Sequence, residues 1–355
     1  MSGGLDGVVA ADTILCHTDR EAGMLWVRGV ALPQLVVLHG YEGTVALLWE
    51  GFAGDGLTRA DTGAALATAR IAAFDNLGTW LPVASARPLA DGIRVCLAML
   101  PNDAPPAVIV GTLSVAVPAL LRAARGEAPL RPDPTFSTAA DLLRMLHGAP
   151  AEEASVAALD TYFTVMAESG LSASSFTARV IASTRASLVC AVLGAWCAFT
   201  GPVHGGAPGP TLDLLDALAT TDDVDGWIEH KLLAGERLMG FGHRVFRGND
   251  PRAEAMRGAL RRMGPAAGRL VFAEQVEQRV AKVLARVKPG RSLPANVEIA
   301  AALLLDAVGI PREAFTAVFA VSRCAGWLAH AMEQQKTGRM IRPISRYVGD
   351  IGALA

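Results

Sequence analysis

Two long stretches of the sequence carry no charged side chain. Residues 186–203 form a run of eighteen uncharged positions, and residues 104–121 are equally uncharged but include Pro105, Pro106 and Pro118. Eighteen apolar residues match the length of a membrane span. The chain also offers a large interior, because 52% of its residues are hydrophobic. We therefore expect residues 186–203 to form a helix that is buried on all sides of a large soluble protein, and we expect no membrane contact.

Length and composition bound the fold class. With 355 residues, the chain is long enough for two or three domains. The high hydrophobic fraction excludes an intrinsically disordered chain. The 32 cationic and 34 acidic residues give a net charge of −2, so we expect no nucleic-acid partner.

The cysteines and the first residues favour a reducing, cytoplasmic location. Five cysteines are an odd number, and no two of them have Cys-x-x-Cys spacing, which argues against a disulfide framework and a zinc cage. Residues 1–12 carry two acids and no cationic side chain, so we expect no secretory signal.

The pattern predicts short strands up to about Val27 and helices from about Pro33 onward. Apolar residues recur at helical spacing in residues 138–148, 276–287 and 314–335. In the first of these segments, Thr138 and Asp141 resemble a capping box, and Gly148 suits the C-terminal stop. Few segments require a strand. The prediction is an all-α fold whose apolar helices pack in several layers or in a dimer interface.

His204 is the first candidate for chemistry. The segment GPVHGGAPG places it between Pro202 and a pair of glycines, directly after the uncharged run. Glycine lets the backbone approach a ligand closely. A single histidine is often structural, but this position in a turn at the end of an apolar helix favours a functional role.

A second candidate is the segment GFGHRVFRGNDPR, residues 240–252, which sets His243 after a Gly-Phe-Gly turn and follows it with three arginines. Glycines and arginines suit an anion. The spacing is not Gly-x-Gly-x-x-Gly and no strand precedes it, so it is a poor dinucleotide-binding fingerprint. The structural alternative is a helix start with Asp250 as N-cap and Pro251 in the first turn, running through Ala259.

Glu298 is the only acid between Glu277 and Asp306, and an apolar helix follows it. Partial burial would raise the pKa of its carboxyl toward the value that suits a general base. The alternative is an acid that the helix dipole favours in the first turn. The spacing alone leaves both interpretations open.

The C-terminal part contributes two arginines. Arg323 lies in an apolar helix and requires an anionic partner, either a protein carboxylate or a substrate. Arg342 precedes a proline in a segment with the character of an exposed loop. His330 and Glu333 could form half of a metal site, but no further ligands have suitable spacing, so we interpret the pair as structural.

Together these segments resemble the citrate synthase family. The similarity extends over nearly the whole chain: residues 4–29 resemble the family's N-terminal β-hairpin region, and SASSFTARVIAST resembles its central helix. GPVHGG, GFGHRVF…DPR, NVE and SRCAGW…RP…YVG follow in the family's order and spacing. The resemblance implies an all-α, citrate-synthase-like multi-helix fold that forms a homodimer. It also implies a large domain, residues 1–202 and 305–355, and a small mobile domain, residues 203–304, which carries the CoA-binding and catalytic residues.

The resemblance further implies a citrate-synthase-type acyltransferase that condenses acetyl-CoA with oxaloacetate. His204 corresponds to the residue that hydrogen-bonds the thioester carbonyl, Glu298 to the base that removes the methyl proton, and His243 to the residue that polarises the oxoacid ketone. The oxoacid carboxylates would be held by Arg252, Arg323 and, from the other subunit, Arg342.

Coenzyme A would enter as a thioester co-substrate, and the resemblance implies neither a metal nor a permanently bound cofactor. Arg247 corresponds to a contact with the CoA phosphate. The backbone of Gly240, Phe241 and Gly242 lies where the family recognises adenine.

Two departures from the family pattern concern the site. Glu298 stands where the family has Asp, and the extra methylene displaces the carboxylate by about an ångström, a misplacement that can cost about 10²-fold in rate. Ser169 stands where a histidine normally helps to hold the oxoacid.

The sequence does not separate this activity from that of a 2-methylcitrate synthase using propionyl-CoA. The two departures add two further alternatives, condensation with another oxoacid and a weakly active CoA-binding paralogue. The presence of both histidines and all three arginines argues against the paralogue.

Overall fold

The computed structural model describes residues 5, 7–205, 208–242, 250–290 and 293–349. Within these ranges the chain forms sixteen α-helices and one small sheet of three short strands. The predicted all-α fold with an N-terminal hairpin region is confirmed.

The sheet lies at the start of the chain, as predicted. Strands β1 (Cys16–Asp19), β2 (Met24–Val27) and β3 (Val30–Ala31) pair antiparallel in that order, with Cys16 opposite Val27. The carboxylate of Asp19 accepts hydrogen bonds from the backbone N–H groups of Glu21 and Ala22, which closes the turn between the first two strands. Leu25 and Val27 alternate inward and anchor the hairpin to the core.

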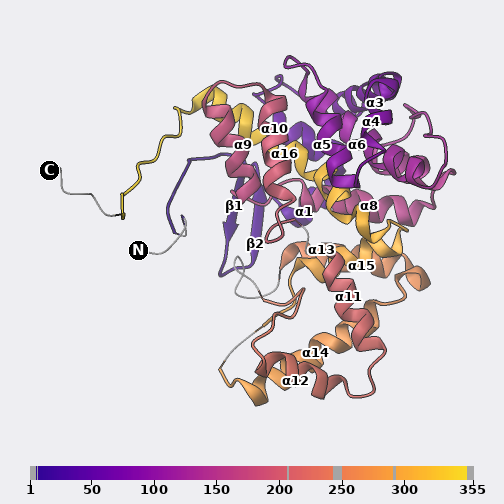
Figure 1. Cartoon of the computed structure of the whole chain (residues 1–355), viewed down its shortest axis with the longest axis vertical. Helices are drawn as coiled ribbons and strands as arrows, with labels where there is room; N and C mark the ends of the chain where they lie inside the picture. Colours follow the sequence, from indigo (N-terminus) through magenta and orange to yellow (C-terminus); the bar gives the residue numbers. More distant parts are fainter. Residues whose placement is uncertain (1–4, 6, 206–207, 243–249, 291–292, 350–355) are drawn as a thin grey trace.

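Most of the first 200 residues and the last long helix form the upper body in Figure 1. Its helices are α1 (Leu32–Leu38), α2 (Gly40–Trp49), α3 (Arg59–Asp75), α4 (Leu77–Ala84), α5 (Leu89–Ala98), α6 (Pro106–Ala124), α7 (Thr138–His147), α8 (Glu153–Met166), α9 (Ala173–Ser183), α10 (Leu188–Phe199) and α16 (Phe315–Thr337).

The other helices lie below this body (Figure 1). They are α11 (Pro208–Ala219), α12 (Val224–Leu233), α13 (Pro251–Arg262), α14 (Leu270–Val287) and α15 (Val297–Ala307), with short 3₁₀ turns η1 (Gly264–Ala267) and η2 (Arg312–Ala314). Helices α13 and α15 pack against each other and against α8, so they connect the lower helices to the body.

The two uncharged runs behave differently from each other. α6 is long and apolar enough to cross a membrane, but 72% of its most apolar window is buried inside the protein, so it is a core helix. Its prolines are compatible with a helix because Pro105 and Pro106 stand at its start, and only Pro118 lies inside it. α10 spans only twelve residues of the other run. The expectation that this run is buried on all sides is wrong for the single chain, because Cys190 and Cys197 are exposed. Burial of this helix in a dimer interface stays a prediction.

The capping prediction for α7 is wrong by one residue. Ser137, not Thr138, is the N-cap, and its Oγ accepts a hydrogen bond from the Ala140 N–H at 3.3 Å. Ser137 has the extended backbone that an N-cap requires, whereas Thr138 is already helical. Asp141 is fully buried and pairs with Arg70 at 3.0 Å. Gly148 ends the helix in the left-handed conformation, as predicted.

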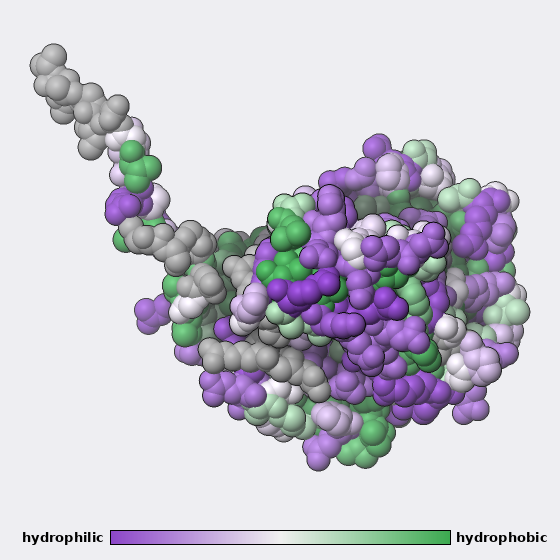
Figure 2. Space-filling view, turned by 90° about the horizontal axis from the view of Figure 1, so that it is seen from below, coloured by the Kyte–Doolittle hydropathy of each residue, from purple (hydrophilic) through white to green (hydrophobic). Residues whose placement is uncertain are grey.

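After α16 the chain has no further helix or strand up to residue 349. The segment is still bonded to the body at Ile341, whose N–H donates to the Ser183 hydroxyl at 3.0 Å. Residues 342–349 are exposed, the side chain of Ile344 is 99% exposed, and an arm of the molecule stands away from the body in Figure 2.

Candidate active site

His204 lies in a tight turn at the end of α10. Its backbone N–H donates to the Gly201 carbonyl at 3.0 Å, and Gly205 N–H donates to the Phe199 carbonyl at 2.9 Å. A Cβ at Gly205 would lie 2.7 Å from that carbonyl oxygen, so the turn requires glycine there. The imidazole stands edge-on to the Phe199 ring, with 5.1 Å between centroids.

The hydrogen bonds of His204 define its tautomer. The backbone N–H of Ser174, in the first turn of α9, points at Nε2 from 3.2 Å. A backbone N–H can only donate, so Nε2 accepts and the ring proton of the neutral form is on Nδ1. Burial and the positive charge of Arg323 lower the pKa of His204 to about 4. At neutral pH this histidine is an uncharged hydrogen-bond donor.

Glu298 lies in the first turn of α15, where its N–H donates to the Asn296 side chain at 2.9 Å. Burial raises the pKa of Glu298 to about 7, although Arg252 lowers it, and Asp250 adds a smaller upward contribution. The helix N-terminus would lower it, so desolvation outweighs the dipole. Both interpretations that the spacing left open describe this residue, because Glu298 is an acid in the first turn of α15 and is also partly buried.

The glycine turn at residues 240–242 is bonded directly to the segment before Glu298. Gly242 N–H donates to the Pro294 carbonyl at 2.8 Å, and Asn296 N–H donates to the Gly240 carbonyl at 2.9 Å. Gly240 has a φ of +82°, and a Cβ there would lie 2.6 Å from the Ile299 side chain. Phe241 is buried beside this turn. Two backbone hydrogen bonds therefore connect the turn at residues 240–242, which is predicted to contact adenine, to the segment that leads into Glu298, the predicted base.

Arg252 is held by the N-cap of its own helix. Asp250 accepts from the Arg252 N–H at 2.9 Å and from its guanidinium at 3.0 and 2.7 Å. The predicted capped helix start is confirmed, and the helix continues beyond Ala259 to Arg262. His243 and Arg247 lie outside the described residues.

Arg323 is 3% exposed, in the middle of α16. Its Nε donates to the Met166 carbonyl at 2.6 Å, and Nη2 donates to the Ser169 hydroxyl at 3.3 Å. Its guanidinium lies over the Phe319 ring, 4.9 Å from the centroid. Burial lowers the pKa of Arg323, and the negative charge of Glu168 opposes that shift. Arg323 was predicted to require an anionic partner. Glu168 is a protein carboxylate near Arg323, and its negative charge partly meets that requirement.

A buried chain of polar side chains lies behind Ser169. His330 contacts Glu168 Oε1 through Nε2 at 3.2 Å and accepts from Arg179 Nε through Nδ1 at 2.9 Å. Arg179 also pairs with Glu333, which accepts from the Thr13 hydroxyl at 2.8 Å. These bonds agree with the interpretation of His330 and Glu333 as structural residues rather than as half of a metal site. Among the described residues, no three His, Cys, Asp or Glu side chains cluster as a metal site.

Aromatic contacts connect the two halves of the site. The Phe199 ring, which contacts His204, packs on Phe319 with 4.7 Å between centroids, and Arg323 lies over Phe319. Arg252 is close enough to influence the pKa of both Glu298 and Arg323. Arg342 is not part of this cluster, because it is exposed in the segment after α16.

Sequence reasoning missed Glu168 and Arg179. Both are buried charges. Arg179 carried a signal, since it is a cation in a helix with few other charged residues and so requires partners. Its partners lie more than 150 residues further along the chain.

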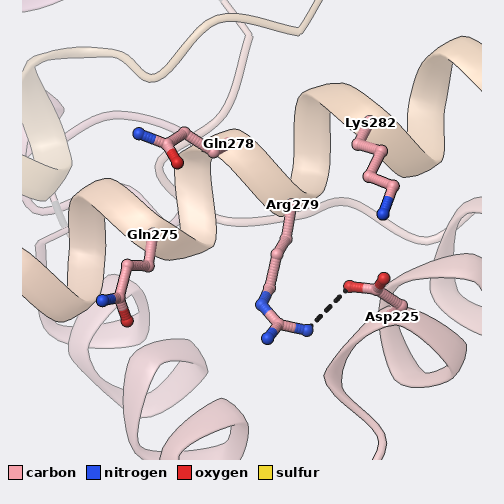
Figure 3. Close-up of a pocket in the computed structure, with 5 residues that line it drawn as sticks. All are labelled: Asp225, Gln275, Gln278, Arg279 and Lys282. Atoms are coloured by element: carbon pink, nitrogen blue, oxygen red, sulfur yellow. Dashed lines mark hydrogen bonds and ion pairs between the residues drawn. The ribbon is translucent and has the colours of Figure 1, made fainter.

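Two hollows elsewhere contain none of the predicted site residues. One, of about 900 Å³, lies between the β1–β2 turn, α1, α8 and α13. The other, of about 470 Å³, lies between α12 and α14 (Figure 3). In it Arg279 pairs with Asp225 at 3.1 Å, and Lys282 lies nearby.

Comparison with known proteins identifies the family. The family model described as citrate synthase, C-terminal domain, matches residues 4–344. The chain belongs to the citrate synthase family. The family and enzyme class predicted from the sequence, a citrate-synthase-type acyltransferase, are thereby confirmed.

Relatives support the assignment over the full length. "Putative citrate synthase 2" of Mycobacterium tuberculosis is 37% identical over 356 residues, which cover 98% of this chain and 92% of that protein. "Citrate/2-methylcitrate synthase" of Bacillus subtilis is 30% identical, with 98% and 96% covered.

Solved structures agree on the fold. The crystal structure of citrate synthase from Thermotoga maritima has a TM-score of 0.87 and 26% identity, and the match covers 100% of this chain and 98% of that one. The Thermoplasma acidophilum citrate synthase, solved as a ternary complex with carboxymethyl coenzyme A and oxaloacetate, has a TM-score of 0.86 at 21% identity, with the same coverage.

Proposed function

We propose that this citrate synthase family member condenses acetyl-CoA with oxaloacetate and releases citrate and CoA. One observation carries the assignment of roles. A neutral histidine, whose Nδ1–H has no partner among the described residues, and a carboxyl with a pKa of about 7 both lie near a pair of arginines, Arg323 beside the histidine and Arg252 beside the carboxyl. A Claisen-type condensation needs a donor at the thioester oxygen and a base at the methyl group.

The chemistry divides among these residues. Glu298 removes a methyl proton from acetyl-CoA, and the Nδ1–H of His204 hydrogen-bonds the oxygen of the enol that forms. The enol carbon attacks the oxoacid ketone, which His243 polarises. Water then hydrolyses the resulting acyl-CoA thioester to citrate and CoA.

The arginines would hold the substrates. Arg252 and Arg323 bind the oxoacid carboxylates, which suit the guanidinium fork. Arg247 contacts a CoA phosphate, and the turn of Gly240, Phe241 and Gly242 receives the adenine. Coenzyme A is a co-substrate in this proposal, and no permanently bound cofactor takes part.

Release of CoA tests the proposal directly. The purified chain is incubated with acetyl-CoA or propionyl-CoA and with a panel of 2-oxoacids, and both free CoA and the acid product are measured. We expect the highest kcat/KM with acetyl-CoA and oxaloacetate. Absence of CoA release with every pair would contradict the proposal.

2-Methylcitrate synthesis is the second candidate. A relative named citrate/2-methylcitrate synthase, at 30% identity, supports it. A higher kcat/KM with propionyl-CoA than with acetyl-CoA in the same panel would assign the chain to that activity.

We also propose that the enzyme is a homodimer in which Arg342 completes the site of the second copy. The exposed segment that carries Arg342 supports this, since its apolar residue Ile344 makes almost no contact with its own chain. Sedimentation at micromolar concentration should give a dimer. A stable monomer would contradict the proposal.

Residues 203–304 are proposed as a small domain that closes on the oxoacid and excludes water. Arg252 would come from this domain and Arg323 from the large one. Small-angle scattering should show compaction when oxaloacetate is added, and an unchanged radius at saturation would contradict closure.

We propose a soluble enzyme of the cytoplasm, which cell fractionation tests.

A further inference from the structure

Tyr162 is a fully buried polar residue that the proposed mechanism does not use. Its side chain lies in α8 and is 0% exposed. Its hydroxyl has no hydrogen-bond partner among the residues that the structure describes. A buried hydroxyl without a partner destabilises a protein and is rare, so it calls for an explanation.

A second buried tyrosine shows the usual arrangement. Tyr41 is also 0% exposed, but its hydroxyl donates to the Val321 carbonyl of α16 at 3.0 Å. The two tyrosines lie against the same aromatic residue, Phe163, with centroid distances of 5.2 and 6.2 Å. The difference between them is the partner of the hydroxyl, not the depth of burial.

The position of Tyr162 points to the oxoacid site. It precedes Met166 by one helical turn, and the Met166 carbonyl accepts the Nε–H of Arg323. Its ring meets Phe319 edge-on at 6.4 Å, and the guanidinium of Arg323 lies over that same Phe319 ring. Tyr162 therefore lines the aromatic wall on which Arg323 rests.

Glu298 is the second charge near the hydroxyl. α8 packs against both α15, which carries Glu298, and α16, which carries Arg323. Burial and the negative charge of Glu298 raise the pKa of Tyr162 well above its ordinary value. The phenol therefore keeps its proton at neutral pH and remains a donor.

We propose that the Tyr162 hydroxyl donates a hydrogen bond to the oxoacid that Arg323 binds, which makes Tyr162 a substrate-binding residue that orients the oxoacid. The inference rests on the proposed function. It also bears on Ser169, which is too short to supply the donor that a histidine gives at that position. The phenol reaches the same ligand from the neighbouring turn of α8.

The test compares Tyr162→Phe with the control Tyr41→Phe in the full-length enzyme. For Tyr162→Phe we expect the KM for oxaloacetate and its calorimetric Kd to rise roughly fivefold to tenfold, as the loss of one hydrogen bond predicts. The KM for acetyl-CoA should stay within about twofold, and Tm should not fall, because the lost hydroxyl has no partner in the described part of the chain. Tyr41→Phe should do the opposite: a lower Tm and an unchanged KM for oxaloacetate.

Two results would overturn the inference while the proposed function stands. In one, the wild-type enzyme binds oxaloacetate, and Tyr162→Phe binds and converts it equally well. In the other, Tyr162→Phe shifts the pH dependence of kcat/KM for acetyl-CoA without changing oxoacid affinity, which would place the hydroxyl on Glu298. If the wild-type enzyme binds no oxoacid of the panel, the proposed function itself is overturned together with this inference.

Discussion

His204 and Glu298 lie in two regions that shift their pKa values in opposite directions. His204 sits at the end of α10 in the large helical body, where burial and Arg323 lower its pKa to about 4. Glu298 begins α15 among the lower helices, where burial raises its pKa to about 7. In both cases desolvation is the main cause, because it disfavours whichever form is charged.

Desolvation therefore gives the two side chains different chemical roles, a hydrogen-bond donor in one region and a base in the other. A partly buried imidazole that loses its charge becomes a neutral donor, which suits an enol oxygen. A partly buried carboxyl whose pKa is raised to about 7 becomes a stronger base once ionised, which suits a methyl proton. The nearby arginines act differently as well: Arg323 adds to the fall of the His204 pKa, whereas Arg252 limits the rise of the Glu298 pKa.

Among the variants that test this difference between His204 and Glu298, His204→Ala is expected to lower kcat the most. Removal of a donor to a developing oxyanion costs about 10²–10³ in kcat, while oxaloacetate affinity should change little. The control is Ser174→Ala, which removes the 2.9 Å hydroxyl contact but keeps the backbone N–H that sets the tautomer. Steady-state kinetics should show a much smaller loss for the control. An equal loss of kcat in both variants would contradict a specific role of the imidazole as the donor to the enol oxygen.

The pH profile tests the two environments together. Below the pKa of Glu298, about 7, kcat/KM for acetyl-CoA should fall about tenfold per pH unit as the base becomes protonated. His204, with a pKa of about 4, should add no limb between pH 5 and 9. A second limb near pH 6.5 would show that His204 titrates as an ordinary histidine.

Ser169→Ala should have a smaller effect. Its hydroxyl accepts from Arg323 at 3.3 Å, so its loss should raise the KM for oxaloacetate by about twofold to fivefold. The control is Ser322→Ala. Ser322 directly precedes Arg323 in α16, and its hydroxyl donates to the Phe163 carbonyl at 2.6 Å. Substitution there should lower Tm and leave KM unchanged. The reverse pattern would remove Ser169 from the oxoacid site.

The smallest expected effect is on the pH dependence of stability. Because folding raises the pKa of Glu298 from 4.5 to about 7, its contribution to stability is lost as pH rises through that window. His204 acts oppositely: its pKa falls from 6.5 to about 4, so its contribution is lost as pH falls. Denaturant unfolding of Glu298→Gln should therefore show stability rising more steeply with pH, between about 4.5 and 7, than in the wild type. Parallel curves would contradict the raised pKa.

The sequence predicts much of this molecule because its signals are local. The hairpin region, the Asp250 cap and the glycine turn at residues 240–242 each depend on neighbours within a few positions. Motif order then identifies the family. Local signals fail where the partner is distant: the contacts that connect Arg179, His330 and Glu168 span more than 150 residues.

Other features follow from packing alone. Tyr162 carries no sequence signal that separates it from Tyr41, because both are aromatic residues in apolar helices and only the surrounding side chains decide which hydroxyl finds a partner. The surroundings of α10 also could not be predicted from its residues alone. Lack of charge indicates burial against some surface, but it does not indicate whether that surface belongs to the same chain.

The most direct test of the central claim, that Glu298 is the base, is CoA release from acetyl-CoA and oxaloacetate by Glu298→Gln, with Glu298→Asp beside it. We expect Glu298→Gln to lower turnover by at least about 10²-fold, with oxaloacetate affinity nearly unchanged. Glu298→Asp should be slower than the wild type if the backbone has adapted to the longer side chain, and as fast or faster if it has not. Near-full activity of Glu298→Gln would contradict the account, because another group would then remove the proton.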